Sequence, residues 1–257
     1  MKSYKEIKAI QMRTVIMLAI LAGLAIVVVM LRNTIVGALG SPQIQESLKN
    51  SPMGKGLASE MSRIIKDFSY YSYSQWFGKT YMQMAALIAV VLSFPLFSKE
   101  REKQTIYLLI GRMTRWEIYS SKVLTGYIAS LITIFGGGIA YLLAAAIMGY
   151  SLPSSMAFAW MFRAMVGTLL LYQIGAYTSL LFKSQVKPFL LDIAIYVGLG
   201  VTPLFKQTKF LDLFGYMGGK EVLKNPTVGI VPTIVVLSVC AVIFTLGYLQ
   251  FRRMDIC

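Results

Sequence analysis

Residues 98–122, SKEREKQTIYLLIGRMTRWEIYSSK, form a charged interruption between two long apolar segments. Its first charges, over 99–103, follow directly on the apolar segment that ends at Phe97. A helix that leaves a bilayer at this point meets water, because ionised side chains are costly in the hydrocarbon core. The stretch therefore predicts an element at the membrane surface.

The second half of this stretch has the features of a helix, a turn and a new helix. An apolar patch over 106–110 precedes Gly111, which can adopt the left-handed conformation that closes a helix. Thr114 and Glu117 then fit the S/T-x-x-E capping box of a helix start. We expect a helix that ends in a sharp turn at Gly111 and a new helix that starts at Thr114, both at the membrane surface.

The composition around this stretch is that of a polytopic membrane protein. Hydrophobic residues make up 56% of the 257 residues and charged residues only 14%. A helical crossing needs about 20 apolar residues. Six segments meet this requirement, near 14–31, 81–97, 123–149, 160–182, 188–205 and 229–250. The fold class expected is all-α, a single transmembrane domain over 1–257 with both termini on one side.

The net charge of +14 predicts orientation rather than nucleic-acid binding. The basic residues are spread over loops and form no stripe with interleaved aromatic residues. Fourteen of them lie in the short segments on the side of the termini, and ten lie in the opposite loops, mostly in one long loop. The positive-inside rule then places both termini and residues 98–122 in the cytosol, with the chain in the plasma membrane.

Two segments outside the predicted spans have their own patterns. Residues 1–13 place basic and apolar side chains on opposite arcs, which predicts a helix in the membrane interface, with a solvated basic tail as the alternative. Residues 33–79 form a long extracellular loop. Its aromatic run over 68–77 is typical of an interfacial belt, and contact with a substrate is the second interpretation.

A few residues within the spans are candidates for a specific role. Gly136, Gly137 and Gly138 allow either close helix packing or a hinge. Asp192 is the one acidic residue inside a predicted span, and Gln173 lies near mid-depth. An intramembrane polar group of this kind is a functional candidate, although a structural pairing explains Asp192 equally well.

Two charged residues near the ends of spans have expected surroundings. Arg163 can extend its side chain to the outer interface without a partner. Asp192 is expected near the opposite end, too far in depth to pair with Arg163. Its expected partner is Lys183, Lys187 or a basic residue of 98–122.

The chain lacks the residues that most enzymes need. It contains no phosphate-binding loop of the G-x-x-x-x-G-K-[ST] type, so it is not expected to hydrolyse ATP itself. It has no histidine, the commonest general base and metal ligand, and no paired carboxylates within the spans. We expect no catalytic residue, no bound cofactor and no metal site.

Residues 98–122 resemble the permeases of type-2 ATP-binding-cassette (ABC) transporters. These proteins carry an E-x-E-x-x-T run after the second span, a Leu-Leu pair, and then a basic residue and a lysine before the third span. The matching positions are Glu100, Glu102, Thr105, Leu108, Leu109, Arg115 and Lys122. Two departures are Gln104, where a glycine is common, and Arg112-Met113, where a proline is common.

The resemblance implies an exporter subunit that works as a dimer of permease copies or homologues. Each copy docks on a separate ATPase subunit, which binds ATP and Mg²⁺, through the matching residues and Arg101 in the surface helix after span two. The spans contain few polar groups, which favours a hydrophobic or amphipathic cargo such as a peptide, lipid or drug.

Two other interpretations stay open at this point. The chain could be a non-energised membrane protein, such as a channel-like pore, an assembly factor or an immunity protein. The second is that residues 98–122 form a solvated loop without a partner, since positive-inside loops have the same charge excess.

Overall fold

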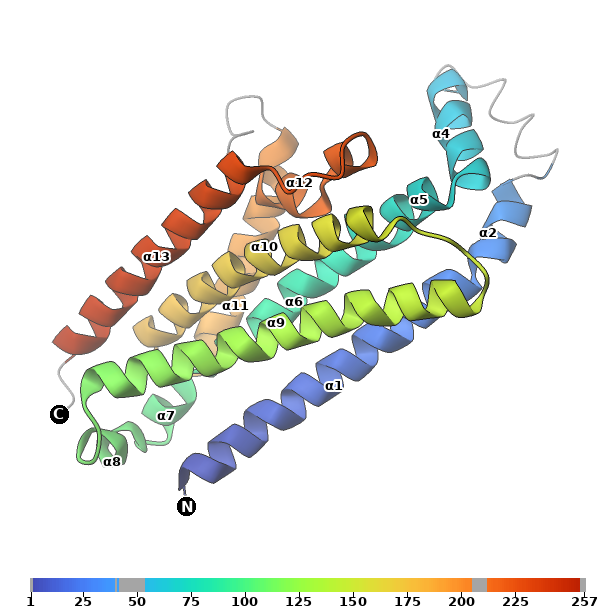
Figure 1. Cartoon of the computed structure of the whole chain (residues 1–257). Helices are drawn as coiled ribbons and strands as arrows, with labels where there is room; N and C mark the ends of the chain where they lie inside the picture. The colour runs from blue at the N-terminus through green and yellow to red at the C-terminus, as the bar shows by residue number, and fades with distance from the viewer. Residues whose placement is uncertain (1, 40, 42–53, 205–211, 255–257) are drawn as a thin grey trace.

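The computed structural model describes residues 2–39, 41, 54–204 and 212–254, and all regular structure in this part of the chain is helical (Figure 1). The elements, in chain order, are α1 Lys2–Met30, α2 Arg32–Leu39, α4 Gly54–Lys66, α5 Phe68–Tyr71, the π-helical η1 Ser72–Tyr81, α6 Met82–Ser93, α7 Ser98–Glu102, α8 Ile106–Ile110, α9 Arg115–Ile147, α10 Ser154–Leu181, α11 Val186–Val201, η2 Thr202–Leu204, α12 Leu213–Gly218, η4 Lys220–Leu223 and α13 Ile230–Arg253.

Five helical runs in the described residues are long and apolar enough to cross a membrane, so the protein is a membrane-embedded helical bundle. They are Ile10–Met30, Phe68–Glu102, Arg115–Ile147, Ser154–Leu181 and Ile230–Arg253. The predicted span over 188–205 is not confirmed. Its helix α11 has 16 residues, which at 1.5 Å per residue is about 24 Å, less than the roughly 30 Å of a hydrocarbon core.

Helix α10 lies at the centre of the bundle, between α6, α9 and α13, and α1 packs along α9 (Figure 1). Eighteen of the 28 residues of α10 are buried, on all sides of the helix. A helix that is apolar and buried all round is the core of its domain. The other long helices each leave one face exposed, and this face is rich in Ile, Leu and Val.

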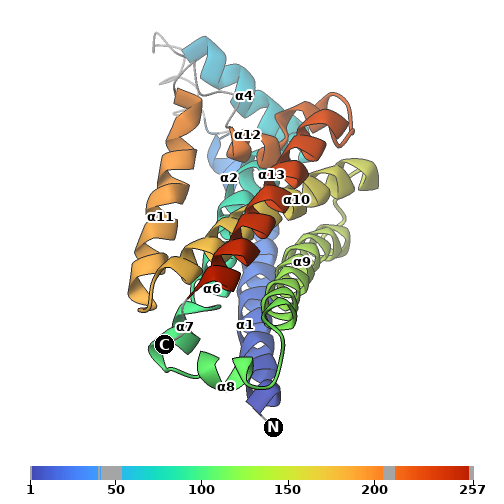
Figure 2. The same cartoon turned by 90° about the vertical axis from the view of Figure 1, so that its left-hand side faces the viewer.

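The two ends of the bundle differ in what they carry. The start of α1, the end of α13 and the short helices α7 and α8 lie at one end, which we call the charged end (Figure 2). Helices α2, α4 and α12 lie at the opposite end. The charged residues of 98–122 are thus gathered where the two terminal helices also end.

Two boundaries differ from those expected. Helix α1 runs unbroken from Lys2 to Met30, so residues 1–13 do not form a helix separate from the first span. No glycine or proline occurs before Gly23 to interrupt the hydrogen bonding. Residues 68–79 also belong to the second long helical run rather than to the loop over 33–79.

Part of the aromatic run over 68–77 packs inside the bundle, whereas the sequence predicted an interfacial belt. Trp76 and Phe77 are fully buried. Trp76 stacks on Tyr141, with ring centroids 5.3 Å apart, and Phe77 stacks on Trp160 at 4.9 Å. Large rings contribute more apolar burial than any other side chain, and this favours packing between helices over exposure.

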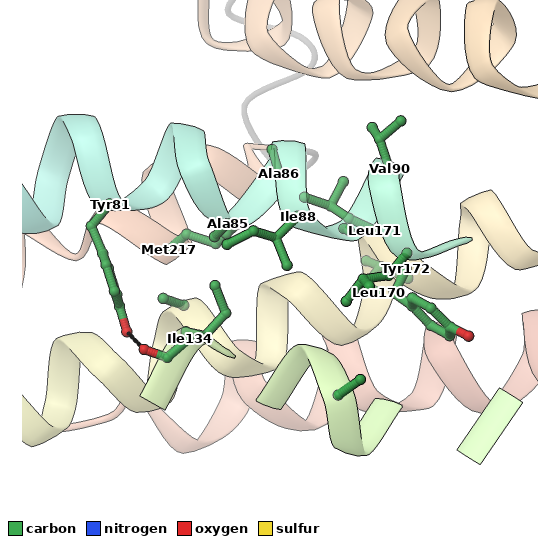
Figure 3. Close-up of a cluster of buried hydrophobic side chains, with 14 of the residues drawn as sticks. Tyr81, Ala85, Ala86, Ile88, Val90, Ile134, Leu170, Leu171, Tyr172 and Met217 are labelled. Carbon is green, nitrogen blue, oxygen red and sulfur yellow. Dashed lines mark hydrogen bonds between the residues drawn. The ribbon is translucent and has the colours of Figure 1, made fainter. Parts of the chain in front are cut away.

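The π-helical turn η1 sets the direction of this aromatic cluster. A side chain at Gly78 would place its Cβ 2.8 Å from the ring of Tyr73, so this wide turn needs a glycine there. At the end of η1, the buried Tyr81 hydroxyl donates a 2.7 Å hydrogen bond to the carbonyl of Ile134 on α9 (Figure 3). The second helical run is thereby fixed against α9.

Arg163 differs from its expected surroundings, because it has partners inside the protein. Its side chain is buried, and its guanidinium donates 3.1 Å hydrogen bonds to the carbonyls of Thr227 and Val228. The carboxylate of Glu221 lies 3.8 Å away. Arg163 therefore holds the segment before α13 against α10 and does not extend to the interface unpaired.

Candidate functional site

Residues 98–122 fold into two short helices before α9. Helix α6 ends at Ser93, a turn that includes Pro95 follows, and α7 begins at Ser98, whose hydroxyl donates a 2.6 Å hydrogen bond to the carbonyl of Phe94. Proline lacks the N–H that would continue the helix. The first charged residues of the stretch therefore lie on a short helix of their own, separated from α6 by this turn.

The chain breaks twice in this stretch, at Gln104 between α7 and α8 and again after Ile110, where the turn predicted at Gly111 leads to α9. Gln104 has a φ of 54°, and it is the one non-glycine residue with positive φ in the described part of the chain, whereas Gly111 does not adopt this conformation. The left-handed region is unfavourable for residues with a Cβ. The turn predicted at Gly111 is therefore present between α8 and α9, but without the left-handed conformation expected for that glycine, and the break at Gln104 is an additional one that the sequence did not indicate.

The capping box at the start of α9 is confirmed. The amide of Glu117 donates to the hydroxyl of Thr114, and the carboxylate of Glu117 accepts a 2.9 Å hydrogen bond from the amide of Thr114. Two of the N–H groups that a helix start leaves unpaired are thereby satisfied.

Glu100 and Lys122 form an ion pair that joins α7 to α9. The exposed fractions of the two side chains are 8% and 14%, so the pair is shielded from water. Thr105 closes the turn after α7, because its amide donates a 2.9 Å hydrogen bond to the carbonyl of Glu100. These three predicted coupling residues hold the local structure of the charged end.

Arg101 extends from α7 to the end of α10. Its guanidinium donates to the carbonyl of Leu180, and the carbonyl of Phe182 lies 3.4 Å away. The last carbonyls of a helix have no intrahelical partner and carry a partial negative charge. Arg101 therefore supplies the missing donor and ties α7 to α10.

Arg115 makes the same kind of contact with α13. Its guanidinium donates to the carbonyl of Arg252 and to that of Met254, the latter at 3.1 Å, and the carbonyl of Phe251 lies at 3.4 Å. The first residue of α9 thus caps the last turn of α13, which is 137 residues away in sequence.

Glu102 connects α7 to the start of α11. Its carboxylate accepts a 2.8 Å hydrogen bond from the side-chain amide of Gln185 and a 3.3 Å hydrogen bond from the backbone amide of the same residue. Gln185 is the residue immediately before α11. Helices α9, α10, α11 and α13 are therefore all bonded to residues of the 98–122 stretch.

The apolar patch over 106–110 faces the bundle more than expected. Ile106 is buried, and Leu109 and Ile110 are partly buried against the core. The side chain of Leu108 lies outside the described residues. The large apolar side chains that are exposed here are Met113, at 42%, and Trp116, at 49%.

Gln173 belongs to a buried polar network between α9, α10 and α13. The Tyr127 hydroxyl donates to its side-chain oxygen, and its side-chain nitrogen donates to the Tyr119 hydroxyl at 3.3 Å. Tyr127 also lies 3.2 Å from the sulfur of Cys240. Sequence reasoning missed the two tyrosines and the cysteine, since no local pattern relates residues 46 to 113 positions apart.

Asp192 is buried and does not have the basic partner expected for it. The hydroxyl of Thr178 on α10 lies 2.6 Å from its Oδ1 atom, and in the described residues no ion pair involves it. Lys183 and Lys187 are exposed. The expected pairing with one of these lysines, or with a basic residue of 98–122, is wrong.

The three glycines of α9 lie where neighbouring helices approach. A Cβ at Gly136 would lie 2.6 Å from a methyl group of Leu18, one at Gly137 would overlap the side chain of Leu21, and one at Gly138 would lie 2.6 Å from Met161. Helix α9 is continuous through all three. They allow α1 and α10 to pack closely on α9.

No group of His, Cys, Asp or Glu side chains that could hold a metal ion occurs among the described residues. The charged side chains at the charged end bind the ends of several helices and do not converge on one point. This arrangement is suited to holding helices together rather than to binding a small ligand. Comparisons with family models, with curated proteins and with solved structures gave no match.

Proposed function

We propose that this chain is the membrane subunit of an ATP-driven exporter of the type-2 ABC family. It works as a dimer, and a separate ATPase subunit binds the charged end from the cytosol. ATP and Mg²⁺ bind to that subunit. The cargo is hydrophobic or amphipathic, such as a peptide, a lipid or a drug.

The observation that carries the proposal is the set of bonds from the 98–122 stretch to the helix ends. Arg101 binds the end of α10, Arg115 binds the end of α13, and Glu102 binds the residue before α11. The Glu100–Lys122 ion pair joins α7 to α9. A displacement of α7 and α8 is therefore passed to four helices as a rigid-body shift, one of the usual forms of conformational switching.

The outward side of the charged end carries exposed side chains that a protein partner can bind. Lys103 and Arg112 are exposed, and so are Met113 and Trp116. Aromatic residues, methionine and arginine are enriched in protein interfaces. The residues that resemble the family motif are mostly engaged within the chain, so the ATPase is expected to contact these exposed neighbours.

The charges favour a cytosolic position for this end. Arg112, Lys183, Lys187, Arg252 and Arg253 are all exposed in segments at the charged end or next to it. Basic residues close to span ends are retained on the cytoplasmic side. An ATPase that uses cytosolic ATP must bind on that side.

The interior chemistry supports an apolar cargo. The polar side chain of Gln173 is bonded to Tyr127 and Tyr119, so the buried amide is not free for a polar solute. Most buried polar side chains are hydrogen-bonded within the protein in this way. A hydrophilic cargo would need free polar groups along its path.

The proposal is tested by purifying the chain with an ATPase subunit encoded beside it. Lys103→Glu with Arg112→Glu reverses two exposed charges on the proposed docking side, and Lys220→Glu reverses an exposed charge at the opposite end as a matched control. We expect the double variant to lose the complex and the control to retain it. Both are to be checked for folding by size-exclusion chromatography and circular dichroism.

Two results would contradict the proposal. The first is a folded double variant that keeps a complex of unchanged stoichiometry. The second is a wild-type chain that forms no complex with any such ATPase and does not change its rate of ATP hydrolysis, which is expected of a non-energised membrane protein.

A further inference from the structure

Asp192 lies in the middle of the contact by which α11 packs on the bundle. The buried residues of α11 are Pro188, Asp192 and Tyr196, four residues apart, so they form one stripe along the helix. This stripe faces α10 and α6. The central position of this contact is thus a carboxyl group with no exposed surface.

The hydrogen-bond distances around Asp192 indicate whether its carboxyl group is protonated. The hydroxyl of Thr178 lies 2.6 Å from Oδ1 of Asp192 and 2.9 Å from the carbonyl of Gly175. A hydroxyl has one proton to donate. If Asp192 is ionised, that single proton goes to one of the two acceptors or is shared between them. If Asp192 is neutral, its own proton goes to Thr178, and the proton of Thr178 goes to Gly175.

The surroundings of the second carboxyl oxygen of Asp192 also favour the neutral, protonated acid. Oδ2 is buried and has no hydrogen-bond partner. It lies where α6 and α11 both approach Gly175, since a Cβ there would overlap the hydroxyl of Ser93 and lie 3.0 Å from Oδ2. An unpartnered carboxylate oxygen in such a site is far less favourable than the carbonyl oxygen of a neutral acid.

The charged and titratable groups on the surrounding elements do not neutralise Asp192. From α7, Arg101 donates to carbonyls at the end of α10. Lys183 and Lys187, which flank the start of α11, are exposed. Tyr196, one turn further along α11, donates its hydroxyl proton to the carbonyl of Leu171.

We propose that the crossing of α6, α10 and α11 is a proton-binding site, in which Asp192 carries the proton while α11 is packed. Loss of the proton leaves a negative charge without a counter-ion in the α11 contact, and this weakens the contact. Proton binding and the packing of α11 are therefore linked equilibria. This site goes beyond the transport function proposed above and does not depend on it.

Infrared spectroscopy of the full chain in lipid nanodiscs tests the proposal, because the C=O stretch of a protonated carboxyl is separate from that of a carboxylate. We expect the wild type to show a protonated-carboxyl band at a pH at which exposed carboxyl groups are already ionised, and the Asp192→Asn variant to lack it. Thr178→Val removes the hydroxyl but keeps the acid, so the band is expected to shift in frequency. This variant keeps the test decisive if Asp192→Asn does not fold.

The controls separate Asp192 from other acids and from a metal-ion site. Glu60→Gln, at an exposed glutamate, is expected to leave the band unchanged. The wild type is also expected to lose thermal stability as the pH rises, and Asp192→Asn is expected to lose less. The proposal is overturned if no protonated-carboxyl band depends on Asp192 or Thr178. It is also overturned if sodium ions stabilise the wild type but not Asp192→Asn.

Discussion

Replacing Lys122 by methionine removes one partner of the ion pair that joins α7 to α9. Methionine has nearly the same length and a similar helix propensity, so the substitution removes the charge and little else. Glu100 would then keep its ionised carboxylate in a place where its side chain is only 8% exposed. Removing one partner of a buried pair costs about 3–5 kcal/mol, and here the carboxylate of Glu100 loses the ammonium group of Lys122.

The assay is a thermodynamic cycle on the free energy of unfolding, measured in mixed micelles titrated with sodium dodecyl sulfate. The three variants are Lys122→Met, Glu100→Gln and the double variant. In the double variant both charges are absent, so most of the loss seen with Lys122→Met is expected to be recovered.

The loss of unfolding free energy in Lys122→Met distinguishes a buried ion pair from an exposed one. An exposed ion pair contributes about 0–1 kcal/mol. If Lys122→Met costs no more than that, the pair is solvated and does not hold α7 to α9. If the double variant is no more stable than Lys122→Met, the loss does not come from the negative charge of Glu100.

Three further predictions test other parts of the structure. Gln104→Gly is expected to stabilise the chain by about 1 kcal/mol, because Gln104 has a positive φ that glycine adopts without strain; an unchanged midpoint of unfolding would contradict this. Gly137→Ala is expected to destabilise it by about 1–3 kcal/mol through overlap with the buried side chain on α1, whereas Gly23→Ala, which meets no atom within 4 Å, is expected to be neutral or stabilising; equal effects of the two would exclude close packing as the reason. Cysteines at Lys103 and Lys220, both exposed and at opposite ends of the bundle, are expected to react with a membrane-impermeant thiol reagent from opposite sides of the membrane; labelling from the same side would overturn the topology.

Several features of the fold follow from local sequence alone, because they depend on residues within one or two helical turns. The capping box of Thr114 and Glu117 is one, since both partners lie three positions apart. The long apolar runs are another, because hydrocarbon thickness sets their length directly. The end of α6 just before Pro95 follows from the missing N–H of proline.

The aromatic residues and the polar side chains show where local reasoning stops. Trp76 and Phe77 lie among serines in a run that resembles an interfacial belt, yet both are buried against Tyr141 and Trp160. An amphipathic ring is suited to either place, and only the approach of α9 and α10 decides between them. Arg163 likewise could extend to the interface, but the segment before α13 offers it carbonyl groups.

By itself, then, the sequence determined that the protein is an all-helical membrane bundle with a charged element between two of its spans. It also marked Asp192, Gln173 and the charges of 98–122 as unusual. Only the tertiary structure decided their partners. Arg115 meets the end of α13 across 137 residues, and Asp192 meets Thr178 at a helix crossing rather than a lysine. The physical reason is that hydropathy and capping act along the chain, whereas a buried charge or hydrogen bond is satisfied by whichever helix end or hydroxyl the packing brings beside it.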